Sequence, residues 1–224
     1  MKTETLDALL AARADKHAVV LVTDLDSGEE RLVGPDGDDP LAADAADALR
    51  ADRSGVIERD GRRLFLHVHN PPLRLIVLGA VHIAQPLARM AVLAGYDVTV
   101  VDPRETFASA ERFPGVGLSH DWPDDALTAL RPDTRTAVVA LTHDPKLDDP
   151  ALMTAIRSPA FYVGALGSKR THASRRERLL ESGAEESEFA RICGPIGLDI
   201  GAKSPAEIAI AIMAQITDHL RKAT

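Results

Sequence analysis

Residues 73–102 read LRLIVLGAVHIAQPLARMAVLAGYDVTVVD, and this stretch decides the fold class of the chain. Apart from Arg74, its first six residues form an apolar run, which is typical of a strand buried on both faces of a parallel sheet. Residues 82–95 carry apolar side chains at helical spacing and end in a glycine, and 97–102 reads as a second buried strand. This strand–helix–strand order predicts a βαβ unit.

The alternation of strands and helices continues to the end of the chain. Further strands are predicted at 136–142 and 160–166, each followed by a helix. The last helix, 204–220, starts with a capping box and is apolar on nearly every side, so we expect it to be buried. We therefore predict an α/β protein whose C-terminal domain, residues 71–224, is a Rossmann-like parallel sheet. Because ligands of such sheets bind beyond the carboxyl ends of the strands, the strand-to-helix turns should carry the chemistry.

Residues 1–70 predict a small α+β N-terminal domain. A first helix should be capped by Thr3 or Thr5, and Asp60-Gly61 supplies the turn of a predicted hairpin. Pro71-Pro72 marks the boundary between the two predicted domains. The predicted elements of the N-terminal domain are helices at 3–15 and 39–52, strands at 17–25 and 30–33, and the hairpin at 54–70.

The composition excludes several classes of partner. The chain has 224 residues, of which 45% are hydrophobic and 27% charged, and its net charge is −8. An acidic chain argues against binding to nucleic acid or to an anionic membrane. No apolar run approaches the roughly 20 residues of a membrane helix, and the N-terminus lacks the apolar region of a secretory signal. A lone cysteine, Cys193, fits a reducing compartment, so we predict a cytoplasmic protein.

The first strand-to-helix turn resembles a damaged dinucleotide fingerprint. Gly79 stands at the first glycine of a G-x-G-x-x-G pattern and Ala84 at the third, while Val81 replaces the second. A glycine is usual there because the backbone must approach a pyrophosphate. The turn therefore either binds a phosphate-bearing ligand or only packs helix against strand.

Two charged residues follow the second strand. Asp102 lies at the distance from Gly79 where an acidic residue binds a ribose 2′-hydroxyl, although a single carboxylate is more commonly solvated. Arg104 can pair with Asp102 or accept a 2′-phosphate. NAD and NADP both stay open as ligands.

His143 and Asp144 follow the third strand, at the rim of the predicted sheet. They can act as an acid–base pair or as a polar clamp. The alternative is a group of helix caps, and for Asp148 and Asp149 we favour that reading.

The turn after the fourth strand is the best anion site in the sequence. Glycines allow tight backbone conformations there, a serine can cap the next helix, and two cations stand just inside it. Cations at a helix N-terminus work against the helix dipole, which a bound phosphate would offset. The alternative is a solvated basic helix face shared with Arg175 and Arg176. The predicted site residues of this turn are Gly164, Gly167, Ser168, Lys169 and Arg170.

The last loop, 193–205, is dense in glycine and surrounds Asp199. Such a loop before a buried helix suggests close backbone approach to a ligand or to another chain. Cys193 should end a buried strand. His67 and His69 share a strand face, but no further ligand is spaced to complete a metal site, so none is predicted.

Four segments of the C-terminal domain together resemble the xanthine dehydrogenase accessory factor family (XdhC/CoxF-type). The resemblance covers about residues 73–220. The segments are VLGAVHIAQPLARMAVLAGYDVTVVDPR (77–104), LTHDPKLDDPAL (141–152), SPAFYVGALGSKRTH (158–172) and PIGLDIGAKSPAEIAIAI (195–212).

This resemblance implies a role in maturing molybdenum hydroxylases. Studied members of the family bind molybdenum cofactor (molybdopterin), assist its sulfuration and pass it to the apo-enzyme, which makes that enzyme the implied partner. A homo-dimer is among the assemblies that the sequence allows. On the family's pattern, the site residues map to Gly79, His82 and Gln85 in the first turn, His143 and Asp144 in the third, Gly164–His172 in the fourth, and Gly197–Gly201 in the last loop.

Two features depart from the family. Members often carry a longer N-terminal domain with a glycine-rich stretch that contains a cysteine, whereas residues 37–49 hold no cysteine here. Val81 stands where a glycine is usual. The chain thus reads as a short form with a reduced N-terminal domain. We keep three alternatives: an NAD(P)-dependent oxidoreductase with His143 as its acid, a nucleotide-sensing module, and an interaction subunit with an inactive site.

Overall fold

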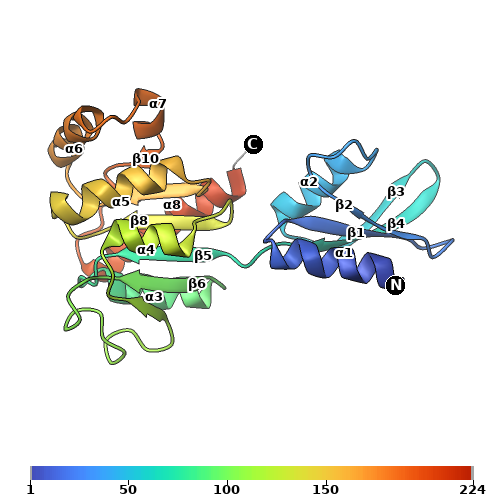
Figure 1. Ribbon diagram of the computed structural model, residues 1–224, viewed down its shortest axis with the longest axis horizontal. Helices are drawn as coiled ribbons and strands as arrows, with labels where there is room; N and C mark the ends of the chain where they lie inside the picture. The colour runs from blue at the N-terminus through green and yellow to red at the C-terminus, as the bar shows by residue number, and fades with distance from the viewer. Residues whose placement is uncertain (1, 223–224) are drawn as a thin grey trace. The chain divides into compact units, whose positions relative to one another are not determined.

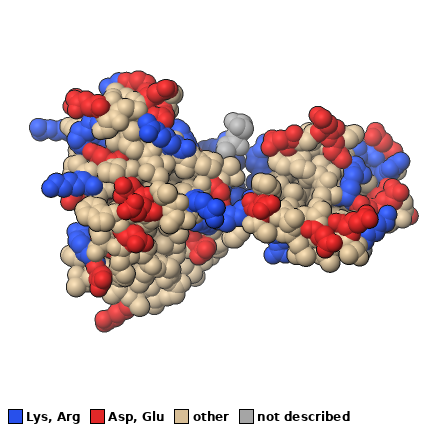
Figure 2. All heavy atoms as spheres, viewed as in Figure 1, with Lys and Arg blue, Asp and Glu red and all other residues tan. Residues whose placement is uncertain are grey.

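The computed structural model describes residues 2–222 of the chain. The chain divides into two compact units, one ending at Pro71 and the other starting at Pro72. Figure 2 shows acidic and basic side chains interspersed on this face of both units, without a large area of one sign. No helix among the described residues is long and apolar enough to cross a membrane.

The N-terminal unit is a four-stranded antiparallel sheet with two helices (Figure 1). Its strands are arranged in the order β2 (Glu30–Val33), β1 (Val19–Asp24), β4 (Arg62–His69) and β3 (Gly55–Arg59). The helices are α1 (Thr3–Ala14) and α2 (Ala42–Ala51). Asp60 and Gly61 both have a positive φ, as the predicted hairpin turn requires.

One prediction for this unit is wrong. Lys2 precedes α1 and makes no capping hydrogen bond through its side chain, while Thr3 is already the first helical residue. Neither predicted threonine caps the helix. The helix starts at Thr3, one residue earlier than it would if Thr3 were the cap.

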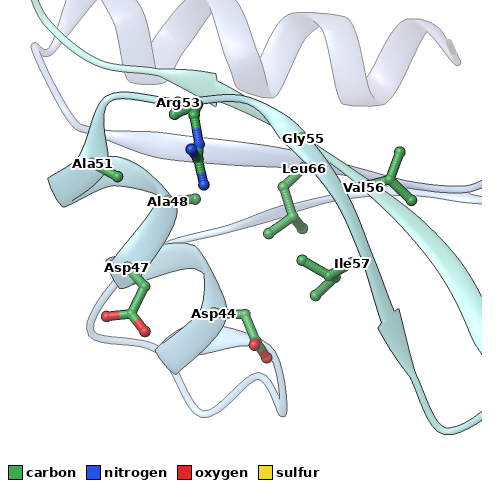
Figure 3. Close-up of a pocket in the computed structure, with 9 residues that line it drawn as sticks. All are labelled: Asp44, Asp47, Ala48, Ala51, Arg53, Gly55, Val56, Ile57 and Leu66. Carbon is green, nitrogen blue, oxygen red and sulfur yellow. The ribbon is translucent and has the colours of Figure 1, made fainter.

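A pocket of about 350 Å³ lies between α2 and the β3–β4 hairpin (Figure 3). Figure 3 shows Ile57 and Leu66 extending from the strands toward α2, which carries Asp44 and Asp47. None of the predicted site residues lines this pocket.

The C-terminal unit is a six-stranded parallel sheet, which confirms the predicted fold class. Across the sheet the strands lie in the order β7-β6-β5-β8-β9-β10. If the six strands are numbered along the chain, this is the order 3-2-1-4-5-6 of the doubly wound Rossmann fold. The order reverses between β5 and β8, which is where such sheets bind ligands. The strands are β7 (Gly117–Ser119), β6 (Asp97–Val101), β5 (Arg74–Leu78), β8 (Thr136–Ala140), β9 (Tyr162–Ala165) and β10 (Ile192–Cys193).

Helices cover both faces of this sheet. Because side chains alternate along a strand, Leu75 and Val77 of β5 face one core while Ile76 and Leu78 face the other. Helices α3 (Ala84–Leu93) and α8 (Pro205–Lys222) pack on the first face. The second face is covered by α4 (Pro123–Leu130), α5 (Pro145–Arg157), α6 (Lys169–Glu181) and α7 (Glu186–Phe189), and Figure 1 shows α4 and α5 in front of the sheet.

The last helix is less buried than its composition predicts. Ser204 and Glu207 form the expected capping box, with mutual side-chain-to-backbone bonds at 2.8 and 3.3 Å. Ile210, however, is 49% exposed, because α8 covers one face of the sheet and Ile210 is not among the side chains that pack into the core on that face. The prediction of a fully buried helix is therefore wrong for this outer face.

Candidate functional site

The first turn, after β5, begins with a glycine, and any other residue there would displace Thr142. Gly79 has a φ of +103°, and an added Cβ would lie 2.6 Å from Cγ2 of Thr142. Its N–H donates to the Val101 carbonyl at 2.8 Å. Gly79 therefore brings the turns after β5 and β8 into direct contact at the point where the strand order reverses.

The Asp102 carboxylate makes its hydrogen bonds within the protein and is not exposed to a ligand ribose. It is fully buried and accepts the Ala80 N–H at 2.8 Å. It also accepts the Arg104 N–H at 3.0 Å and two guanidinium N–H groups at 2.8 Å each. Burial alone raises the pKa of Asp102, but these hydrogen bonds outweigh it and hold the pKa below its ordinary value.

Arg104 is held in place with its guanidinium partly open to solvent. Its side chain is 45% exposed, is paired with Asp102 through two nitrogens, and lies with Cζ 4.5 Å from the centre of the Phe107 ring. A Rossmann dinucleotide site usually offers a carboxylate at this strand end. Here the exposed group at the end of β6 is a cation.

The turn after β8 holds His143 at the rim. His143 has a φ of +65°, its side chain is exposed, and its N–H donates to buried Asp148 at 3.1 Å. Asp144 caps α5 by accepting the Lys146 N–H at 3.0 Å. The expectation that Asp148 or Asp149 caps this helix is wrong, because both lie inside it.

Asp148 also accepts the hydroxyl of Thr142 at 2.5 Å, and burial raises the pKa of its carboxyl group. Thr142 is the residue that meets Gly79 in the first turn. Asp148 therefore holds the turn after β8 through hydrogen bonds to both Thr142 and His143.

The turn after β9 has the geometry expected of an anion site. Ser168 caps α6 by accepting the Thr171 N–H at 3.1 Å. Gly167 has a φ of +147°, and an added Cβ would lie 3.0 Å from the Thr171 side chain. Lys169 and Arg170 are exposed in the first helical turn. The turn thus places the start of a helix and two exposed cations together at the carboxyl edge of the sheet.

The alternative of a solvated basic face on α6 is wrong for one of its members. Arg176 is exposed and pairs with Glu186, but Arg175 is only 2% exposed. The Arg175 guanidinium donates to the Leu166 carbonyl at 3.0 Å and lies 3.8 Å from Asp148. Its Nε and Nη1 atoms make no hydrogen bond to any described residue.

The glycines of the last loop serve close packing within the chain. Gly197 donates its N–H to Gln215 of α8 at 2.8 Å, and a Cβ there would lie 3.1 Å from Ala211. A Cβ on Gly194 would overlap the His172 ring. We call residues 167–170, the turn after β9, the anion turn. The Ile196 N–H donates to the carbonyl of Ala165 at the end of β9, at 3.2 Å, so the last loop lies beside the anion turn.

The predicted site residues divide into two groups. His82 and Asp199 are exposed in the first turn and last loop respectively. Gln85 instead lines a separate pocket of about 290 Å³ beside α3, and with its amide turned so that the oxygen faces Arg112 it accepts two hydrogen bonds from that guanidinium, at 2.9 and 2.8 Å. Predicted residues on turns that meet the carboxyl edge are Gly79, His82, Asp102, Arg104, His143, Asp144, Gly167, Ser168, Lys169, Arg170 and Asp199. The prediction of Gly164 as a turn residue is wrong, because it lies buried inside β9, where an added Cβ would lie 2.6 Å from the Ile196 side chain.

No metal site is formed by the part of the chain from residue 2 to 222, where no cluster of three or more His, Cys, Asp or Glu side chains could hold an ion. The His67 and His69 rings lie 4.2 Å apart on β4. Cys193 ends β10 but is only partly buried, with Sγ 3.5 Å from His219 Nε2, and burial raises the pKa of its thiol.

Three residues organise these turns in ways that the sequence patterns do not predict. Thr142 carries no pattern of its own, Asp148 is expected from the sequence as a helix cap, and Arg175 enters only in the alternative of a solvated helix face. Arg175 lies three residues after His172 and four before buried Leu179, and this places it on the inward stripe of α6. That spacing is the signal that could have found it.

Comparisons with known proteins identify the C-terminal unit. The XdhC Rossmann domain family matches residues 75–216. The molybdenum cofactor insertion chaperone PaoD of Escherichia coli (strain K12) is 32% identical over 146 residues, 65% of this chain and 40% of that protein. A probable xanthine dehydrogenase subunit of Bacillus subtilis (strain 168) is 32% identical over 154 residues, 68% of this chain and 44% of that protein.

A solved structure described as a xanthine dehydrogenase from Bacillus halodurans covers 97% of this chain and 65% of its own, with a TM-score of 0.70 and 26% identity. The chain spans only 32%, 40% and 44% of three curated relatives that it matches. The activities and partners of those longer proteins are therefore not transferred whole to this chain.

Proposed function

Because the chain belongs to the XdhC family, we propose that it is an accessory protein in the maturation of a molybdenum hydroxylase of the xanthine or carbon monoxide dehydrogenase type. In this proposal it binds molybdenum cofactor, or a related phosphate-bearing ligand, and delivers it to the cytoplasmic apo-enzyme. The observation that carries the proposal is the turn after β9, where a capped helix start with two exposed cations lies at the carboxyl edge of the sheet.

The residues of this turn fit the phosphate of a pterin cofactor. The backbone N–H groups at the start of α6 offer hydrogen bonds to a phosphate, and Lys169 and Arg170 supply positive charge. Gly167 keeps side-chain bulk away from the helix start. When bound, the cofactor would carry the molybdenum that the hydroxylase needs, while this chain would hold the phosphate and shield the cargo during transfer.

The test is to isolate the protein from cells that synthesise molybdenum cofactor and to measure its bound pterin and molybdenum. We expect both to copurify with the wild-type chain and to be lost from the Lys169→Ala, Arg170→Ala variant. Arg176→Ala, which removes an exposed cation of the same helix, is the matched control and should keep the cargo. A wild-type protein free of pterin would refute the proposal.

A second candidate function is binding or sensing of NADP. The observation in its favour is Arg104, a cation held rigidly where a Rossmann site meets the adenosine ribose. The Asp102 carboxylate is not free to accept the ribose hydroxyls of NAD, since its oxygens already accept four hydrogen bonds within the protein. Enhanced NADPH fluorescence without NADH binding, in a protein that lacks pterin, would favour this function.

A further inference from the structure

A chain of buried polar contacts connects the turn after β8 to the turn after β9. The Thr142 hydroxyl donates to Asp148, Asp148 lies 3.8 Å from Arg175, and Arg175 donates to the Leu166 carbonyl. We call Thr142, Asp148 and Arg175 the buried brace. Its outer end, Thr142, also touches Gly79, so three of the candidate ligand turns are linked through it.

The position of Arg175 explains how one side chain reaches two turns. It lies in the second turn of α6, and helical side chains lean toward the N-terminus of their helix. The guanidinium therefore lies beneath the anion turn, on the side of the sheet that α5 covers. Asp148 extends from the first part of α5 to meet it, and its two oxygens hold Thr142 and the His143 N–H.

Stability alone gives no reason for this arrangement. Arg175 is 2% exposed and Asp148 is 2% exposed, so both charges have lost their hydration. Two Arg175 nitrogens have no hydrogen-bond partner among the described residues. A well-packed apolar side chain would fill such a place at lower cost in free energy, and unsatisfied buried groups call for another explanation.

We propose that the buried brace positions the anion turn and the His143 rim relative to one another, with Arg175 as the positioning residue. This inference rests on the proposed function, because the turns it aligns are the candidate ligand turns. Arg175 touches no ligand in this arrangement. It acts through the Leu166 carbonyl on one side and through Asp148 on the other, and it places a positive charge below the site that the phosphate occupies.

The test uses the full chain labelled with ¹⁵N, titrated with inorganic phosphate and followed at the Lys169 and Arg170 amide signals. The Arg175→Met variant should weaken phosphate binding by roughly two- to thirtyfold, the range of energetic couplings between linked sites. It should also speed hydrogen exchange at the His143 N–H, which bonds to Asp148 on the other helix. A residue that only stabilises the fold would lower the melting temperature without this local change in the native state.

Two further variants keep the proposal falsifiable. Thr142→Val retains the methyl group against Gly79 but removes the hydroxyl, which donates to Asp148 and accepts the Asp144 N–H, and we expect it to change both readouts even if Arg175→Met fails to fold. Arg176→Met, on the exposed side of α6, should change neither. Absence of saturable shifts in the wild type would refute the phosphate site itself. Unchanged His143 exchange in both brace variants would refute the brace.

Discussion

The pairing of Asp102 with Arg104 changes what a Rossmann strand end can recognise. A carboxylate at this place normally accepts a ribose hydroxyl, but here it is fully buried and bonded to Arg104 and to the Ala80 N–H. The group left at the surface is the guanidinium. The sequence correctly raised the pairing as one of two readings, and only the structure shows that the pair forms.

The low pKa of Asp102 makes its contribution to stability dependent on pH. Because the folded-state pKa lies below the ordinary value of 3.8, the stabilisation is present above that value and is lost as pH falls through the folded pKa. We expect the wild type to be more stable than Asp102→Asn at pH 6, and the difference in unfolding free energy to shrink below about pH 4. Urea unfolding across this range measures it, and a difference independent of pH would contradict the prediction.

The two cations of the anion turn are the sharpest test at the level of single residues. If both make charge-assisted hydrogen bonds, the double change Lys169→Ala, Arg170→Ala should weaken binding of a phosphate-bearing ligand by roughly 2–4 kcal/mol. Both side chains are exposed, so the fold should survive. Calorimetry with molybdopterin measures the effect, and unchanged affinity would rule out the turn as the phosphate site.

Val81 bears on the alternative of a dinucleotide ligand. It stands where a glycine lets a pyrophosphate approach, and its side chain is half-buried against the core beneath α3. Val81→Gly should improve binding of NADH and NADPH while costing roughly 0.5–1 kcal/mol in chain entropy, together with the lost packing. Fluorescence titration of both proteins decides the matter. Micromolar binding by the wild type, unimproved by glycine, would show that Val81 is no obstacle.

Local patterns predicted the residues whose roles depend on their neighbours in sequence. Ser168 caps α6, and Asp60-Gly61 turns the hairpin, because caps and turns involve a few consecutive residues. The alternative of a solvated Arg175 is wrong, because its burial depends on contacts with Leu166 before the helix and with Asp148 of α5, which the pattern of α6 alone does not show.

At the level of elements, helix α8 and the last loop share one acceptor. The Gln215 side-chain oxygen accepts the Tyr162 hydroxyl at 2.6 Å and the Gly197 N–H at 2.8 Å. The contact therefore joins β9, α8 and the loop beside the anion turn. The glycine-dense sequence indicated close backbone approach there, and for Gly197 the neighbour is a helix of the same chain.

Gln215→Leu should free the loop while leaving the sheet intact. Two donors lose their acceptor, so we expect a loss of about 1–3 kcal/mol in unfolding free energy and faster exchange of the Gly197 N–H. Thr217→Ala is the control, because within residues 2–222 the Thr217 hydroxyl bonds only to the Met213 carbonyl of its own helix. Hydrogen exchange measured by NMR gives the result, and equal protection of Gly197 in both variants would count against the role of Gln215.

Long apolar elements were all predicted, whereas two of the short elements were not. The buried strands β5, β6, β8 and β9 match the apolar runs of the sequence. Strand β7 has three residues and helix α7 has four, too few to show a period, and neither was predicted. The exposed side of α8 was not predicted, because the composition of a helix does not show which of its faces pack against other elements.

At the level of the whole molecule, the parallel sheet follows from the alternation of strands and helices, but the strand order does not. That order brings β5 beside β8, and the contact between Gly79 and Thr142 depends on it. The candidate site is thus a product of topology, assembled from turns far apart in sequence. All of its residues lie between 79 and 199, within the unit that starts at Pro72.

This placement makes a prediction about a shortened chain that begins at Pro72. The unit has its own two cores on the faces of a six-stranded sheet, so it should fold without the preceding residues. We expect it to bind molybdopterin with the affinity of the full chain, because no candidate ligand residue precedes Gly79. Circular dichroism and calorimetry on both proteins check folding and affinity, and the shortened Arg175→Met variant should show the same loss of phosphate binding as its full-length counterpart. A shortened chain that folds but binds at least tenfold more weakly would show that residues before Pro72 contribute to the site.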